Sequence, residues 1–262
     1  MFFSLSSWQL ALVIFAIVGG SAALGFAIGV YLREHSDSYR EPFGVLQGAL
    51  LGLVALLLAF GMSLALGRYE DRRAATVAEA NAIGTSFLRA QLVAEPERTK
   101  SLALLRHYID LAIRVAYEIP GSSSMARTTA AEGVLQRRLW RLGGRSIATA
   151  PIASAPRLYV DSLNETFDDQ LARLSSLNNR VPNAVLTVEV IAAALALGLL
   201  ALHISILGRG LAPVLLAAAL VSVLLLVTFD LDRPTRGLIK VPAAPLLAER
   251  TSMSFPPAAS GP

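Results

Sequence analysis

The residue whose chemistry is most informative is an acidic side chain inside an apolar stretch. Glu189 lies about two turns into the apolar stretch 184–207, and His203 lies about one turn from its other end. Ionisable groups in such stretches are costly and generally face protein or water. Glu189 is therefore a candidate cation site, proton acceptor or partner of Arg180 or of an arginine after stretch 43–67. A buried structural pair is the alternative, and for His203 we expect a solvated role.

Other catalytic chemistry is poorly supported. The chain has no cysteine and three scattered histidines, which argues against thiolate nucleophiles, disulfides, iron–sulfur clusters and histidine metal centres. No nucleophile–base motif, P-loop or nucleotide fingerprint is present. We therefore expect no enzyme and no cofactor.

Four long apolar stretches must position these side chains. The chain is 54% hydrophobic and 16% charged, and three runs contain no charged residue, namely 8–32, 43–67 and 211–229. About 20 apolar residues cross the hydrocarbon core of a bilayer as a helix. A soluble protein is excluded, and we predict an all-α polytopic membrane protein with four transmembrane helices.

The spans pair into two hairpins. Spans 8–32 and 43–67 form a hairpin within residues 1–67, and spans 184–207 and 211–229 form another within 184–229. No Lys or Arg precedes the first apolar run, which favours a retained helix over a cleaved signal peptide. Glycines recur every fourth residue in both spans of the first hairpin, which predicts close packing of spans one and two, within one subunit or between subunits (Gly25 and Gly29; Gly44, Gly48 and Gly52).

The distribution of basic residues predicts the orientation. Nine Lys and Arg residues flank one side of the spans and three flank the other, and the basic side is normally cytoplasmic. We therefore expect a protein of the inner cell membrane. Both termini and residues 68–183 are expected to lie in the cytoplasm. This accounts for the net charge of +4, so no nucleic-acid partner is expected.

Residues 68–183 form a helical cytoplasmic domain inserted between spans two and three. Apolar periodicity predicts helices over 68–94, 97–118, 130–142 and about 157–178, with loops between them. Charges at i,i+4 steps on the second helix predict an exposed, internally salt-bridged face (Arg106, Asp110, Arg114 and Glu118). The basic helix 130–142 either contacts anionic lipid headgroups or packs with a solvated basic face (Arg137, Arg138, Trp140 and Arg141). The cytoplasmic tail 230–262 is expected to be disordered after about residue 249.

A large apolar stripe runs along span two. It consists of Leu53, Leu57, Phe60 and Leu64, with Leu56 beside it. In a monomer the stripe would face lipid or other helices. Around the axis of an oligomer, the same residues could form a hydrophobic constriction that gates by dewetting.

The end of span two resembles bacterial bestrophins. Residues 57–73 read LLAFGMSLALGRYEDRR, and the matching positions are Leu57, Leu58, Phe60, Arg68, Tyr69, Asp71 and Arg73. Glu70 and Gly67 depart from the pattern. The phrases at 68–92, 177–185 and 230–241 are similar to a group of bacterial membrane proteins described as bestrophin-like.

The resemblance implies a function. Bestrophins have four spans, cytoplasmic termini, a helical insert after span two, and five subunits whose second spans line the pore. The chain is then expected to be a passive ion channel of the bacterial cell membrane. The resemblance assigns the neck of the pore to Leu53, Leu57, Phe60 and Leu64. It assigns the inner mouth of the pore to Arg68, Tyr69, Asp71 and Arg73. Its partners would be the lipid bilayer, a permeant inorganic ion and copies of itself, favouring a pentamer. Both signs of charge occur at the mouth, so selectivity stays open.

Two alternatives to a channel remain. A non-conducting membrane-anchored protein could use the cytoplasmic helices for interaction or sensing, and a proton-coupled transporter could use Glu189. Animal bestrophins bind calcium at an acidic cluster after span four, where this chain has Asp230 and Asp232. Two carboxylates followed by Arg233 fall short of the six to eight oxygens that calcium takes. A capping or salt-bridge role, with Arg236 as a partner, is the better interpretation.

Overall fold

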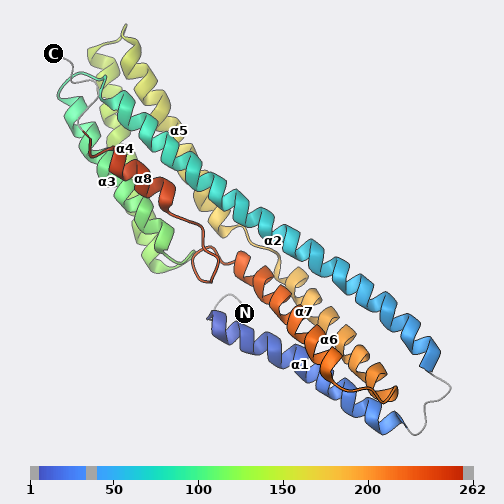
Figure 1. Cartoon of the computed structure of the whole chain (residues 1–262). Coiled ribbons are helices and arrows are strands. Elements are labelled where there is room, and N and C mark those ends of the chain that lie inside the picture. Colours follow the sequence, from blue (N-terminus) through green and yellow to red (C-terminus); the bar gives the residue numbers. More distant parts are fainter. Residues whose placement is uncertain (1–5, 34–39, 256–262) are drawn as a thin grey trace. The chain divides into compact units, whose positions relative to one another are not determined.

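The computed structural model describes residues 6–33 and 40–255, with side chains from residue 44 onward in the second range. These residues form eight α-helices and, within the described ranges, no strand (Figure 1). The helices are α1 (Ser7–Leu32), α2 (Arg40–Ala90), α3 (Glu97–Tyr117), α4 (Ser123–Thr149), α5 (Ser154–Asn178), α6 (Asn183–Ile206), α7 (Ala212–Leu231) and α8 (Ala244–Ser252). The predicted all-α fold class is confirmed.

Four helices are long and apolar enough to cross a membrane, namely α1, α2, α6 and α7. Each matches one of the four predicted spans to within a residue or two, apart from α2, which extends further, so the chain is a multi-pass membrane protein. The helix α2 continues through 51 residues without a break, well beyond the apolar run that ends at Gly67. Gly208, with φ of 69°, reverses the chain between α6 and α7, a conformation that favours glycine.

The described helices divide into two compact units. The span unit comprises residues 1–69 and 180–239, and the helical unit comprises residues 70–179 and 240–262. The first unit therefore contains α1, α6, α7 and the first part of α2. The second contains α3, α4, α5, α8 and the remainder of α2.

In the span unit, α1 packs closely against α6 (Figure 1). A Cβ added at Gly25 would overlap the backbone of Gly198, and Ser21 Oγ donates a hydrogen bond to Ala194 O at 2.6 Å. The prediction that Gly25 and Gly29 contact span two is therefore wrong. These glycines admit α6 instead, because α6 offers small residues at the same level.

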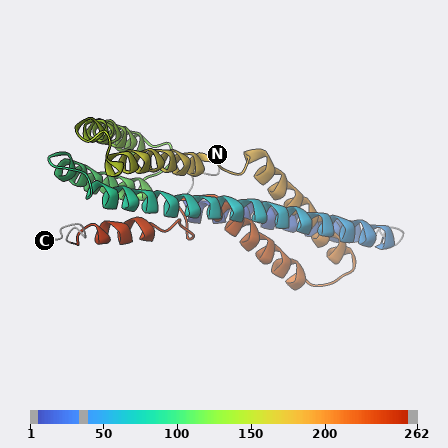
Figure 2. The same ribbon diagram turned by 90° about the horizontal axis from the view of Figure 1, so that it is seen from above.

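In the helical unit, a continuous apolar core joins α2, α3, α4, α5 and α8. Figure 2 shows α8 (red) running alongside the later part of α2 (teal), and Glu249 of α8 lies directly against Gly84 of α2. Leu246 is fully buried in this core. The tail is thus helical through Ser252 and Met253 is buried, so the expectation of disorder from about residue 249 is wrong up to that point; residues 256–262 lie outside the described residues.

The short helix α8 and the residue that follows it contact the charged face predicted on α3. Arg106 donates two hydrogen bonds to Met253 O and lies over the ring of Phe87 at 5.3 Å, while Asp110 accepts a 2.6 Å bond from Arg250. The predicted internally salt-bridged face is therefore wrong. Arg106 and Asp110 bind the tail, and Glu118 accepts from Ser124 and Thr128 of α4, contacts that the periodicity of α3 alone could not reveal.

The helix α4 is longer than the periodicity predicts. It begins at Ser123 because the Ser122 side chain caps it by accepting from Met125 N. It continues past Leu142 because Gly143 faces α5, where an added Cβ would lie 2.7 Å from Val160 Cγ2.

Candidate pore face and buried ionisable groups

Within the span unit, α2 has one buried and one exposed face. Val54, Leu58, Gly61 and Ala65 recur at helical spacing and are buried against the chain's own helices. The predicted neck residues lie on the other side: Leu53, Phe60 and Leu64 are 54%, 60% and 47% exposed, and Leu57 is half-buried. The structure therefore brings these four residues onto one outward stripe.

Small residues also occupy exposed positions on α2. Gly48, Gly52 and Gly67 are exposed, and a Cβ added at any of them would meet no atom within 4 Å. Small residues on an exposed helix face allow another helix to approach closely. The exposed side of α2 is thus suited to contact with a further helix.

The predicted inner-mouth residues do not gather on one face. Asp71 is exposed, on the side of α2 that carries Phe60, and Arg68 is half-buried. Tyr69 packs against the core of the span unit, and exposed Arg73 lies 3.7 Å from Glu70 in an i,i+3 ion pair.

Glu189 is enclosed in the span unit. It is 2% exposed, and neither carboxyl oxygen has a hydrogen-bond partner among the described residues. Its carboxyl group lies directly against Gly61, where an added Cβ would overlap Oε1. Because Gly61 has no side chain, α2 leaves room for the Glu189 side chain of α6.

Two aspartates at the C-terminal end of α7, Asp230 in its last turn and Asp232 at its C-cap, bind backbone groups. Asp230 Oδ2 accepts from Leu238 N at 2.8 Å and Ile239 N at 2.7 Å, and Asp232 accepts from Val181 N at 3.1 and 3.2 Å. Asp230 thus folds the segment after α7 back onto the end of that helix, and Asp232 ties the end of α7 to the segment that precedes α6. No group of three or more His, Asp or Glu residues in the described ranges is arranged to hold a metal ion.

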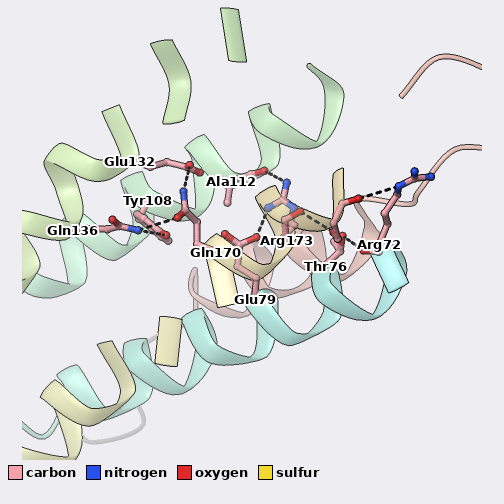
Figure 3. A network of polar contacts seen from close by, with 10 residues as sticks. Arg72, Thr76, Glu79, Tyr108, Ala112, Glu132, Gln136, Gln170 and Arg173 are labelled. Carbon is pink, nitrogen blue, oxygen red and sulfur yellow. Dashed lines mark hydrogen bonds and ion pairs between the residues drawn. The ribbon is translucent and has the colours of Figure 1, made fainter. Parts of the chain in front are cut away.

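The helical unit contains a buried polar network (Figure 3). Arg173 of α5 forms a buried ion pair with Glu79 of α2 and donates to Ala112 O of α3 at 2.9 Å. On the same helix, Gln170 donates to Glu132 of α4 at 2.8 Å. Four helices are therefore joined through polar side chains inside the core.

Two further residues, Gln136 and Arg72, extend this network. Gln136 Nε2 donates to Tyr108 OH at 3.1 Å and to the Gln170 side chain at 3.3 Å, as drawn in Figure 3. Arg72, 1% exposed, donates to Ser176 O at 3.2 Å and to Asn179 O at 2.8 Å. Arg72 thereby satisfies carbonyl groups at the end of α5.

Burial perturbs the acids of the network. It raises the pKa of Glu132 to about 7, against 4.5 ordinarily, despite the Gln170 hydrogen bond that lowers it. Burial also raises the pKa of Glu79, and the charge and hydrogen bond of Arg173 oppose that rise. A carboxyl group in a low-dielectric interior favours its neutral form.

Sequence reasoning missed the roles of Gly61 and Arg173. Arg173 counted only as a basic residue on the cytoplasmic side, although it is 3% exposed. Nothing in the sequence of α5 distinguished Arg173 from the solvated charged residues of the same helix. For Gly61, the signal would have been a small residue on the buried stripe of α2 opposite an acid in another span.

The described residues define an all-helical membrane protein with four helices able to cross a membrane. The bestrophin-like domain family matches residues 14–246, so the chain belongs to the bestrophin-like family, whose members are ion channels. The resemblance at the end of span two is thereby confirmed at the level of the family.

Solved structures support the fold. A variant of a bacterial bestrophin homologue from Klebsiella pneumoniae superposes with a TM-score of 0.67 at 13% identity, covering 95% of each chain. A variant described as a membrane protein gives 0.64 at 12% identity, covering 92% of this chain and 97% of that one. No curated protein matches the chain.

Proposed function

We propose that the protein is a passive ion channel of the bacterial inner membrane, with a pore lined by α2 from several copies of the chain. The observation that supports this most is the outward stripe of Leu53, Leu57, Phe60 and Leu64 on a helix whose opposite face is buried. A ring of such side chains is a hydrophobic constriction, which can gate by dewetting. Asp71, further along the same side, would add charge at the inner mouth.

The oligomer is part of the proposal, with a pentamer favoured. Four spans in one chain leave no room for a central pore, so copies must supply the wall. The open positions at Gly48, Gly52 and Gly67 support close approach of α2 helices from neighbouring copies. Both termini and the helical unit are assigned to the cytoplasm from the basic residues that flank the spans.

Ion flux into liposomes tests the proposal. We expect the purified protein to relieve salt gradients passively, and Phe60→Ala to raise the flux because truncation widens the constriction. The matched control is Leu220→Ala in α7, which truncates a side chain that is 61% exposed on another span. Unchanged flux in folded, oligomeric Phe60→Ala protein would argue against the neck; no flux from a stable oligomer would argue against the channel.

One observation favours a second candidate, transport coupled to a proton. Glu189 is buried in a span without a hydrogen-bond partner among the described residues, as a proton-binding carboxyl group would be. The test is Glu189→Gln in liposomes with a pH gradient. Proton-coupled uptake that is lost in this variant would support the transporter, whereas passive flux that is retained would support the channel.

A further inference from the structure

A pocket of about 440 Å³ lies between α3 and α4 in the helical unit. Its apolar lining comes from Ala103, Leu104 and Leu142, and its polar lining is wholly basic (Lys100, Arg138, Arg141 and Arg145). Pockets of about 300–1,000 Å³ with an apolar floor and a few converging polar groups are typical of small-molecule sites. Helical spacing on α4 places Arg138, Arg141 and Arg145 along one side of that helix.

None of the four cations has an acidic partner among the described residues. Ion pairs elsewhere in the described residues occupy Arg73, Arg89, Arg98, Arg173 and Arg250, and none involves a pocket cation. Among the described residues, these four side chains form one hydrogen bond, from Arg141 Nε to Arg137 O at 3.3 Å. Like charges gathered on one pocket repel one another, so a bound anion would relieve a standing electrostatic cost.

The imbalance belongs to α4 as a whole. This helix carries five arginines and a single acid, Glu132, which is buried and turned to Gln170. No acidic residue of α4 is therefore exposed to neutralise the pocket. Solubility alone does not call for this pattern, since mixed charges serve it equally well.

We propose that this pocket binds a phosphate-bearing ligand that has an apolar part. Arginine guanidinium groups bind phosphate oxygens in pairs of charge-assisted hydrogen bonds, and three of the four cations are arginines. The apolar part of the ligand contacts Leu104 and Leu142. This site is separate from the pore face and does not rest on the proposed channel.

A natural reporter lies beside the pocket. Trp140 and Arg141 line an adjoining pocket of about 560 Å³ on the α5 side of α4, so Arg141 borders both. The chain has two tryptophans, and Trp8, which is 75% exposed, is in a span. Trp8→Phe protein therefore gives fluorescence from Trp140 alone.

The experiment titrates inorganic pyrophosphate and a short-chain phosphatidic acid into full-length Trp8→Phe protein in zwitterionic nanodiscs. We expect saturable changes in Trp140 fluorescence, with the phosphatidic acid binding more tightly because it also fills the apolar floor. Adding Arg138→Gln and Arg141→Gln should weaken both affinities about tenfold or more. Arg127→Gln is the matched control, since it removes an exposed arginine of α4 that does not line the pocket.

A second arm identifies the source of the phosphate. If nanodiscs that contain phosphatidic acid compete with pyrophosphate, the natural ligand is a lipid headgroup; if pyrophosphate binds equally in both, the ligand is soluble. Either result retains the site. Absence of saturable binding, or equal weakening by the control variant, would overturn it, because the charges would then act only as a diffuse field.

Discussion

The carboxyl group of Glu189 in α6 lies directly against Gly61 of α2, the residue that follows Phe60. Phe60 is 60% exposed while Gly61 is buried, so adjacent residues of α2 serve opposite faces. A change in the bulk at this contact therefore acts on the helix that carries the proposed neck. The pair is where packing of the span unit and the proposed pore are most closely linked.

Gly61→Ala should destabilise the protein through this contact. An added Cβ overlaps Glu189 Oε1, but the carboxyl group is the end of a flexible side chain and can move. We therefore expect a loss of about 1–2 kcal/mol rather than failure to fold. Thermal unfolding of the purified protein measures it.

Glu189→Ala provides the control for this contact. In its presence, Gly61→Ala should cost much less, because the overlapping carboxyl group is gone. Additive losses in the double variant would show that the two residues do not interact.

The stability of the helical unit should depend on pH through Glu132. Its pKa is about 7 in the folded protein against 4.5 ordinarily, so between these values the folded state holds a proton that the unfolded state has released. Stability therefore falls as pH rises from about 4.5 to about 7 and then levels off, by about 3 kcal/mol in total. Denaturant unfolding across this range measures the slope.

Glu132→Gln should flatten that slope, since its amide oxygen still accepts from Gln170 while it cannot ionise. A slope of the same sign is expected from Glu79, whose pKa is also raised by burial. An unchanged slope would mean that Glu132 does not titrate in this range.

The buried pair of Glu79 and Arg173 should matter far more than exposed pairs. Arg173→Gln leaves a buried carboxyl group without its cation and removes a bond to Ala112 O, which we expect to cost about 3–5 kcal/mol. Arg98→Gln is the control, because Arg98 and Glu95 are both substantially exposed and such pairs add little to stability. Comparable losses for the two variants would contradict the burial of the network.

The helix α8 should be held by apolar packing more than by its ion pair. Leu246 is fully buried, so Leu246→Ala is expected to cost about 2–4 kcal/mol. Arg250→Gln breaks an exposed pair with Asp110 and should cost about 1 kcal/mol or less. Limited proteolysis of the tail, followed by mass spectrometry, distinguishes them; earlier cleavage in the arginine variant would reverse this assignment.

The spans were predictable because their lengths follow from the bilayer and charge is excluded from them. The partner of each glycine was not, because Gly25 fits equally against any helix with a small residue at the right level. The structure selects Gly198 of α6 for it. Which helix meets which therefore depends on packing across the unit rather than on local pattern.

For charged residues, local spacing suggested partners that the structure does not show. Arg106 and Asp110 have the spacing of a self-paired helix face, yet they bind Met253 O and Arg250. That outcome requires the tail to fold back, a contact about 140 residues away in sequence, as the Arg250–Asp110 bond shows. The stripe from Leu53 to Leu64 was predictable as a stripe, while its service as a pore face stays a prediction.

The absence of cysteine from the chain allows the most direct test of that prediction. Single substitutions Leu53→Cys, Phe60→Cys and Leu64→Cys would be treated with a water-soluble, charged thiol reagent while ion flux is recorded in liposomes. We predict rapid modification and a change in flux at all three positions, and none at the control Leu220→Cys. Flux that is unaffected at the three stripe positions, or altered equally at the control, would show that α2 does not line an ion pathway.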